Sequence, residues 1–379
     1  MAMQLKSVLT ALRDVAPEHL AEPWDKVGLQ AGAERRNISA ALLCIDLTEA
    51  VVREAVRRKC ELIVSYHPPV FKPLTGLVEA GVGADWKQRA LALAVRHKLA
   101  VYAPHTALDA VAGGMNDWLA GGLGEGDVRP IVPTAAGARF KVATFVPGKQ
   151  ADAVRDAMFA AGGGGQGAYR GCSFNTPGVG TFEPLHGAKP AVGRIGKMSW
   201  VEELRVEVLC PAAVVGPVVA ALRAAHPYEE PAFDVIPLDP RSGGAAPATT
   251  GAGRLLTLDA PIQAGTLASR LKAHLGVKHV KASWPGKSAK IATVAVCVGS
   301  GGSLFEHPAA AGADAFVTGE MQHHGVLDLA QRGKVVLLAG HTQTERPHLR
   351  VYRERIRATA AAGVKWRLSR ADRPPMAWR

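Results

Sequence analysis

The sequence lacks the features of a membrane protein or a disulfide-rich protein. No apolar stretch approaches the roughly 18 residues that a membrane span needs, so we expect no membrane association. The five cysteines are scattered and never spaced as C-x-x-C, which favours a reducing cytoplasm and argues against a thiolate zinc site. The N-terminal stretch carries charges every few residues, so we expect an amphipathic helix there and not a signal peptide.

Several motifs of nucleotide and nucleophile chemistry are also absent. No G-x-S-x-G supports a Ser/His/Asp hydrolase. The glycine-rich VGSGGS at 298–303 lacks the Lys-Ser/Thr of a P-loop, and its glycines can equally serve a close backbone approach. The net charge of +12 could suit an anionic partner. However, the basic residues are spread along the chain without the aromatic alternation of single-strand binders, so nucleic-acid binding is only a minor alternative.

The chain is long enough for two or three domains. Its 379 residues are 48% hydrophobic and 21% charged, which is typical of a soluble globular protein. Strand-like and helix-like segments alternate through 1–134 and again through 248–379, which predicts an α/β core with mostly parallel sheets. Residues 135–247 instead read as two strand–helix–strand copies ending in a Gly/Pro/Ser-rich linker, so we expect an inserted ferredoxin-like α+β domain there.

Polar groups recur where predicted strands end. Residues 103–109 (APHTALD) and 339–345 (AGHTQTE) share the form A-x-H-T-x-x-acid after an apolar run. They supply His105 with Asp109, and His341 with Glu345. His67, in SYHPPVF, follows a third strand. Because the carboxyl ends of parallel strands meet at one edge of a sheet, these side chains are expected to converge.

The donor set suits a metal but leaves its identity open. Imidazole and carboxylate without thiolate fit zinc, manganese, iron or nickel, and a carboxylate can bridge two ions. Taken singly, each group has a structural reading: His67 can end a strand, and Glu345 can close a helix N-terminus. Their joint placement predicts a metal site. In TGEMQHHG, Glu320 ends a strand, and one of His323 and His324 can face the same cleft.

These stretches resemble a known family. WDKVGLQAG, SYHPPVF, APHTALDAVAGG, CVGSGGS, FVTGEMQHHG and GHTQTE occur in the order found in GTP cyclohydrolase type 2-like proteins. These are dinuclear-metal-centre proteins, also called NGG-interacting-factor-like. The resemblance spans nearly the whole chain. The middle region, from FVPGKQADAVRDAMFAAG to AAHPYEEPAFDVIPL, resembles the inserted ferredoxin-like domain of the longer members.

The resemblance implies a pair of divalent metal ions at the bottom of a cleft, in a homohexameric ring. Carried onto this chain, the metal ligands fall on His67, Asp109, His341 and Glu345, with Glu345 as the bridge. His105 becomes an adjacent ligand or an acid/base group.

Two departures from the family pattern bear on this implied site. Many members have two consecutive histidines where this chain has Tyr66 and His67, so we expect one or two ions per chain. Lys26 stands where asparagine is usual.

Two functions follow as hypotheses. The first is a metal-dependent hydrolase-like enzyme acting on a small substrate of unknown identity, phosphorylated or a nucleotide such as GTP. His105, Glu320 or His324 would then move protons. The second is a non-catalytic regulatory or scaffold protein, in which the metals are structural and the inserted domain binds a partner or a small ligand. An open coordination position would favour the enzyme, because structural metal sites are closed by protein ligands.

Overall fold

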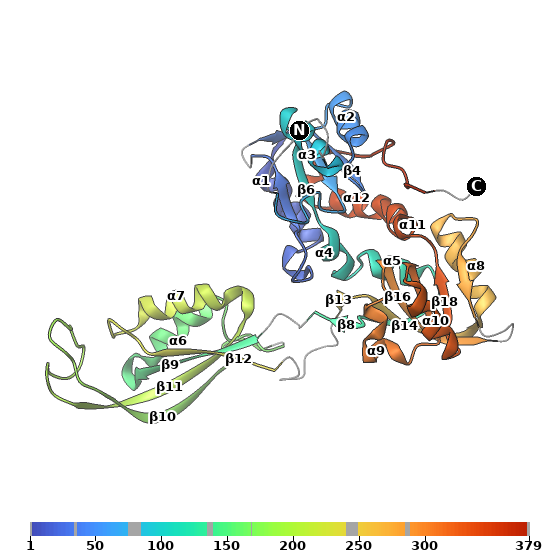
Figure 1. Cartoon of the computed structure of the whole chain (residues 1–379). Helices are drawn as coiled ribbons and strands as arrows, with labels where there is room; N and C mark the ends of the chain where they lie inside the picture. The colour runs from blue at the N-terminus through green and yellow to red at the C-terminus, as the bar shows by residue number, and fades with distance from the viewer. Residues whose placement is uncertain are drawn as a thin grey trace. The chain divides into compact units, whose positions relative to one another are not determined.

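The computed structural model of the chain describes residues 2–33, 36–74, 85–134, 139–167, 169–239, 249–284 and 289–376. The chain divides into two compact units, one formed by Met1–Thr134 with Ala248–Arg379 and the other by Ala135–Pro247 (Figure 1). We call them the core unit and the inserted unit. The predicted linker at 239–253 lies largely outside the described residues. The expected α/β class is confirmed, with parallel strand pairs in both large sheets of the core unit.

The first sheet of the core unit has the strand order β19-β4-β5-β6-β2. Four of its strands are parallel and β2 is an antiparallel edge. Strands β4, β5 and β6 are buried along their whole length, as expected for parallel strands covered on both faces. The bounds are β2 Gly28–Ala31, β4 Ala40–Cys44, β5 Leu62–Ser65, β6 Ala100–Ala103 and β19 Lys365–Leu368.

Helices cover both faces of this first sheet. Helices α2 (Glu49–Arg57) and α3 (Trp86–Arg96) share one apolar cluster with it, and α1 (Leu5–Val15) and α12 (Leu349–Arg357) share another. The sequence predicts the start of α2 correctly, since the Thr48 hydroxyl oxygen accepts a hydrogen bond from the Val51 N–H at 3.3 Å. Such a side-chain cap satisfies a backbone donor that the first helical turn leaves without a partner.

The second sheet has the strand order β15-β18-β17-β16-β14-β7. Only its centre is parallel, because β16, β17 and β18 pair in parallel while the outer strands pair antiparallel. Helices α5, α8 and α10 lie against these strands. The bounds are β7 Gly126–Arg129, β14 Arg254–Gln263, β15 Lys281–Ser283, β16 Lys290–Ser300, β17 Ala315–Glu320, β18 Val335–Leu338, α5 Met115–Gly121, α8 Ala264–Leu275, α9 Pro308–Ala311 and α10 His323–Gln331.

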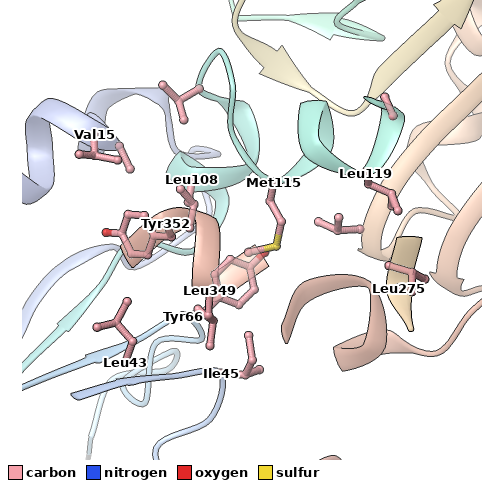
Figure 2. Close-up of a cluster of buried hydrophobic side chains, with 14 of the residues drawn as sticks. Val15, Leu43, Ile45, Tyr66, Leu108, Met115, Leu119, Leu275, Leu349 and Tyr352 are labelled. Carbon is pink, nitrogen blue, oxygen red and sulfur yellow. The ribbon is translucent and has the colours of Figure 1, made fainter. Parts of the chain in front are cut away.

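The two sequence segments of the core unit exchange elements. Strand β19, from the end of the chain, joins the first sheet, while β7 and α5, from before the insertion, join the second. One continuous apolar core results, and Figure 2 shows Leu43, Leu108, Met115 and Tyr352 meeting in it. Neither segment can therefore bury its own apolar surface without the other.

A buried arginine ties the same segments together. Arg254 is 1% exposed, and its Nη2 donates to Asp117 Oδ2 at 3.0 Å. The same nitrogen donates to the carbonyl oxygens of Ala110 and Val111, both at 3.2 Å. Breaking a buried ion pair by removing one partner typically costs about 3–5 kcal/mol. The pair is thus a strong constraint on how the two segments meet.

Residues 369–372, which we call the C-terminal clasp, are held by buried acids. The Glu54 carboxylate accepts hydrogen bonds from the Ser369 hydroxyl at 2.6 Å and from the N–H groups of Arg370 and Ala371, both at 2.9 Å. These bonds outweigh burial and lower the pKa of Glu54 to about 2. Asp372 in turn accepts from the Ile45 N–H at 2.8 Å. The clasp is therefore fixed to the end of β4.

The inserted unit has the element order β9-α6-β10-β11-α7-β12. Its antiparallel sheet has the strand order β10-β11-β9-β12, and both helices pack on one face over a separate apolar cluster (Figure 1). This arrangement is compatible with the expected ferredoxin-like insertion. The bounds are β9 Arg139–Pro147, α6 Ala151–Ala160, β10 Ser173–Phe182, β11 Ser199–Pro211, α7 Val215–Ala225 and β12 Phe233–Pro237.

Two short strand pairs complete the core unit. Strand β1 (Met3–Gln4) pairs with β3 (Asn37–Ile38), and β8 (Val132–Pro133) pairs with β13 (Gly251–Ala252). The second pair places the points where the chain leaves and re-enters the core unit side by side. Within the described residues, no helix combines the length and the apolar character that crossing a bilayer requires.

Deleting residues 135–247 and joining the ends with a short Gly/Ser linker should leave a folded core unit. The Thr134 N–H already donates to the Thr250 carbonyl at 3.0 Å, so little rearrangement is needed to close the gap. Circular dichroism and a cooperative thermal transition would measure this. A protein that is insoluble at every linker length tried would contradict the insertion model.

Candidate metal centre

Three histidines lie just beyond the carboxyl ends of core strands. His67 follows β5, His105 begins α4 (His105–Ala110) after β6, and His341 begins α11 (His341–Glu345) after β18. The last of these strands belongs to the second sheet and the other two to the first. The core unit thus brings the carboxyl-end edges of its two sheets to a common site.

Glu345 lies between two of these histidines. Its Oε1 is 3.5 Å from His67 Nε2 and 3.3 Å from His341 Nε2. The donor atoms of the three residues lie within 4.8 Å of one another. The Glu345 side chain is 2% exposed, and its Oε2 has no hydrogen-bond partner among the residues that the structure describes. A buried carboxylate oxygen without a partner is costly, so this oxygen is suited to contact a cation.

Each of the three site histidines is oriented by a carboxylate on its other ring nitrogen. Because an ionised carboxylate only accepts hydrogen bonds, Nδ1 must donate and Nε2 is left as the nitrogen that can bind a metal or a proton. Carboxylate–histidine pairs of this kind accompany most histidine ligands. The pairs are His67 with Asp46 (2.9 Å), His341 with Glu320 (3.0 Å) and His105 with Asp25 (2.8 Å).

The acids hold protons firmly on the two histidines next to Glu345. Burial opposes the charged form of His67, but hydrogen bonds to Asp46 and Glu345 raise its pKa to about 10. The hydrogen bond to Glu345 raises the pKa of His341 to about 9. Burial raises the pKa of Glu345, and the hydrogen bonds from both histidines outweigh it, so the net shift is downward. A bound divalent cation would take the place of these protons, so metal binding should release them.

Asp109 is half-buried beside this group but is not part of it. Its Oδ1 accepts a hydrogen bond from the Tyr66 hydroxyl at 2.7 Å. Burial raises the pKa of Asp109 to about 7. The three-residue donor group does not include Asp109, although Asp109 lines the same cleft as His341 and Glu345. The Tyr66 hydroxyl therefore already hydrogen-bonds one oxygen of Asp109, which the sequence predicts as the fourth metal ligand.

The segment around Asp25 braces His105. Asp25 Oδ2 accepts from the Thr106 N–H at 3.1 Å and from the Thr106 hydroxyl at 2.5 Å. His105 has a φ of +30°, a conformation rare for a residue with a side chain, and its N–H donates to the Tyr66 carbonyl at 3.2 Å. Strained backbone of this kind often accompanies functional sites. The strain fixes His105 next to His67, with ring centroids 5.4 Å apart.

The glycine-rich stretch that begins at the end of β16 gives the carboxylate room. A Cβ at Gly299 would lie 2.7 Å from Glu345 Oε1 and 3.2 Å from His341 Nε2. Gly299 also has a φ of +62°, which disfavours any side chain. The loop therefore serves a close backbone approach, as its sequence allowed, and it forms one wall of the donor group.

A cleft of about 560 Å³ opens over these residues. Its lining includes His105, Asp109, His341 and Glu345, together with Trp24 and Phe71. The two aromatic side chains are 55% and 41% exposed and meet edge to face at 5.9 Å. The cleft has the size and composition of a small-molecule site, with an aromatic pair and a group of acids and imidazoles.

The structure brings together most of the residues predicted from the sequence. His67, His341 and Glu345 form the donor group, Glu320 hydrogen-bonds His341, and His105 and Asp109 line the cleft. His324 is exposed in α10, its ring contacts that of His323 at 5.4 Å, and it does not line the cleft. Its proton-transfer role stays a prediction.

Sequence reasoning missed two functional acids, Asp25 and Asp46. Asp46 stands directly after the apolar β4 run, so the rule that polar residues follow strand ends could have found it. Asp25 lies in WDKVGLQAG, where only the neighbouring Lys26 drew attention. The Lys26 N–H donates to Asp25 Oδ1 at 2.7 Å, so its backbone helps to hold the acid.

The chain is similar to proteins of several organisms over most of its length. It is 34% identical over 337 residues to a GTP cyclohydrolase 1 type 2 homolog of Halalkalibacterium halodurans, covering 89% of this chain and 88% of that protein. It is 32% identical over 386 residues to NIF3-like protein 1 of Rattus norvegicus, covering 99% and 92%. A crystal structure of a Bacillus cereus protein related to NIF3 superposes with a TM-score of 0.76 at 31% identity, covering 100% and 99%.

The family model that matches is described as Duf34/NIF3 (NGG1p interacting factor 3), and the match runs over residues 3–375. It therefore includes both strand-end histidine motifs, the donor group and the inserted unit. The resemblance inferred from the sequence is confirmed, and the chain belongs to the Duf34/NIF3 family.

Proposed function

We propose that this protein is a metal-dependent hydrolase-like enzyme whose divalent metal is held by His67, His341 and Glu345. The observation that carries the proposal is the buried Glu345 carboxylate, with one oxygen near both Nε2 atoms and the other without a partner. We propose Asp109 as the further ligand of a second, weaker ion. Zinc, manganese, iron or nickel suits this donor set.

The residues fit such an ion on structural grounds. Both Nε2 atoms face the same carboxylate oxygen, both Nδ1 atoms are engaged by acids, and Gly299 leaves the space that a side chain would fill. A carboxylate that accepts a hydrogen bond from the far ring nitrogen fixes the ring orientation and makes the imidazole a better ligand. The donor group supplies three protein ligands, the number that catalytic zinc sites commonly have.

When bound, a divalent ion supplies Lewis-acid polarisation of a substrate oxygen and lowers the pKa of water. The chain's own part is to orient the substrate and move protons. His105 offers Nε2 to the cleft while Asp25 holds Nδ1, the arrangement of a general acid or base. Glu320 would orient His341, and a proton-transfer role for Glu320 or His324 is retained as part of the proposal.

A small planar substrate carrying phosphate is the class that we favour. The exposed Trp24 and Phe71 rings at the cleft offer stacking surfaces, and the excess of basic residues suits an anionic group. The name of the Halalkalibacterium halodurans relative, GTP cyclohydrolase 1 type 2 homolog, makes a nucleotide such as GTP the first compound to try. We further propose a homohexamer, which size-exclusion chromatography with light scattering would test.

A regulatory or scaffold role is the second candidate, and one observation favours it. The Tyr66 hydroxyl engages Asp109 at 2.7 Å, which removes an oxygen that a second ion would need. With that position weakened, the remaining ion would join α11 to the end of β5 and stabilise the core unit. The two candidates are distinguished by catalytic turnover of a substrate, which only the enzyme would show.

Glu345→Ala should remove most of the bound metal while leaving the fold largely intact. Elemental mass spectrometry of protein purified without a metal-affinity tag measures metal per chain, and thermal denaturation checks the fold.

Asp46→Asn should lower metal affinity by about 10- to 100-fold, because it weakens the hydrogen bond that orients His67 and leaves the ligands themselves in place. Glu202→Ala, at an exposed position in β11, is the matched control. Unchanged metal content in Glu345→Ala would rule out the carboxylate as a ligand.

Tyr66→His should raise the metal content from one ion per chain towards two. The change adds an imidazole and frees the Asp109 oxygen that Tyr66 now engages. Tyr66→Phe frees the same oxygen without adding a ligand and should stay near one ion. If the natural protein already holds two ions, Tyr66 does not weaken the second position.

Metal-loaded protein should hydrolyse a member of a panel of nucleotides and phosphorylated heterocycles. His105→Gln should lower kcat by about 100-fold or more, because it removes the acid/base group while keeping a polar side chain. His97→Gln replaces an exposed histidine after α3 and is the control for the general effect of removing an imidazole. A His105→Gln variant as active as the natural protein would exclude the proton-transfer role. Absence of turnover across the panel with full metal occupancy would favour the regulatory candidate.

A further inference from the structure

The inserted unit contains a cavity of its own, of about 600 Å³. Its floor is the face of the sheet opposite the helices, because Phe145 and Arg205, which line it, alternate with the helix-facing Val146 and Val206. Its walls come from the segment between β10 and β11 and the segment between α7 and β12. The cavity is mainly apolar, with a few convergent polar groups, which is the usual make-up of a small-molecule site.

A carboxylate without a cationic partner lines this cavity. Glu203 is 9% exposed, and its Oε1 accepts a hydrogen bond from the Tyr228 hydroxyl at 2.6 Å. Within the part of the chain that the structure describes, no ion pair joins Glu203 to a lysine, arginine or histidine. Burying a charge is expensive unless it is paired. The carboxylate is therefore placed to receive a positive group from outside the chain.

Small residues keep space around Glu203. A Cβ at Gly180 would lie 2.3 Å from Glu203 Oε2, so any side chain there would displace the carboxylate. Gly178 lies opposite Glu203 in the β10–β11 pairing and also lines the cavity. Strand β10, the neighbour of the strand that carries Glu203, thus has glycines at positions where a larger side chain would cover the carboxylate.

A histidine holds the backbone of Tyr228, the residue whose hydroxyl contacts Glu203. His226 is 8% exposed, and its Nδ1 accepts a hydrogen bond from the Tyr228 N–H at 3.1 Å. Its Nε2 must then be the protonated nitrogen, which donates to the Phe145 carbonyl at 3.0 Å. This chain of bonds fixes Tyr228 over Glu203 before any ligand arrives. Such preorganisation lowers the entropic cost of binding.

The other groups in the cavity also suit a cation. Tyr228 and Phe182 have ring centroids 6.0 Å apart, and aromatic faces attract cations. Arg205 lines the cavity and donates a hydrogen bond to Glu207 at 3.0 Å, a carboxylate that also accepts one from Lys141 at 2.6 Å. Glu229 accepts from the Lys189 N–H at 2.8 Å, which joins the two wall segments. The lining residues include three acids, Glu203, Glu229 and Glu230, and two basic residues, Lys189 and Arg205.

We propose that this cavity binds a small organic cation, a protonated amine or amidinium on a planar apolar body. Glu203 would pair with the positive group, and the aromatic residues would contact the body. The inference is independent of the metal centre, since every residue that carries it belongs to the inserted unit.

A fluorescence titration of the full-length protein with p-aminobenzamidine, an aromatic amidinium, tests the proposal. We expect saturable binding, with 4-aminobenzamide, its neutral analogue, binding about 10- to 100-fold more weakly because it lacks the charge-assisted hydrogen bond. Glu203→Gln should weaken p-aminobenzamidine binding by a similar factor, since it keeps the side-chain shape and an acceptor for Tyr228. Glu202→Gln, on the adjacent exposed residue, should bind like the natural protein.

Each contrary outcome would overturn the proposal. No saturable binding, or equal binding of the neutral analogue by the natural protein, would exclude a cation site without relying on any variant. Equal binding by Glu203→Gln and Glu202→Gln would exclude Glu203 as its anchor. Glu345→Ala separates this site from the proposed function: it should lose metal and keep p-aminobenzamidine binding, and a loss of both would assign the probe to the metal centre.

Discussion

The site depends on one interaction, a buried carboxylate held between two imidazoles that are themselves held by carboxylates. Glu345 alone would be too costly to bury, and its position is tolerable only because His67 and His341 bring positive charge to it. Those imidazoles can carry that charge because Asp46 and Glu320 bind their far nitrogens. An arrangement that stores protons in this way is well suited to exchange them for a divalent cation.

The exchanged elements of the core unit explain how the parts of the site reach one another. His67 is on the first sheet, while Glu345 follows a strand of the second, so their distance is set by how the two sheets meet. The shared core shown in Figure 2 and the buried pair of Arg254 with Asp117 fix that relation. The chain leaves the core unit and returns to it through the paired strands β8 and β13, and the residues of these contacts all belong to the core unit.

The sequence was sufficient to predict that His67, His105 and His341 stand at strand ends, because each follows an apolar strand and two of them share a repeated motif. It could not predict how that repeat would diverge. In the first copy His105 itself takes the positive φ of +30°, while in the second copy the residue before the histidine, Gly340, takes a φ of +94°. Nor could it assign Asp25 or Asp46, because their partners come from distant segments and only the folded chain brings them into contact.

The C-terminal clasp has a consequence for the order in which the protein is made. Asp372 binds the Ile45 N–H, one residue before the acid that orients His67, and β19 completes the sheet that carries both. During translation these early residues emerge long before β19 and the clasp exist. Until then, β4 lacks the neighbouring strand β19, and the segment that carries Asp46 lacks the hydrogen bond from Ile45 to Asp372. Completion of the group formed by His67, His341 and Glu345 is thus expected late, after the later-made segment has folded back. The exposed edge marks the interval in which the nascent chain most needs chaperone protection.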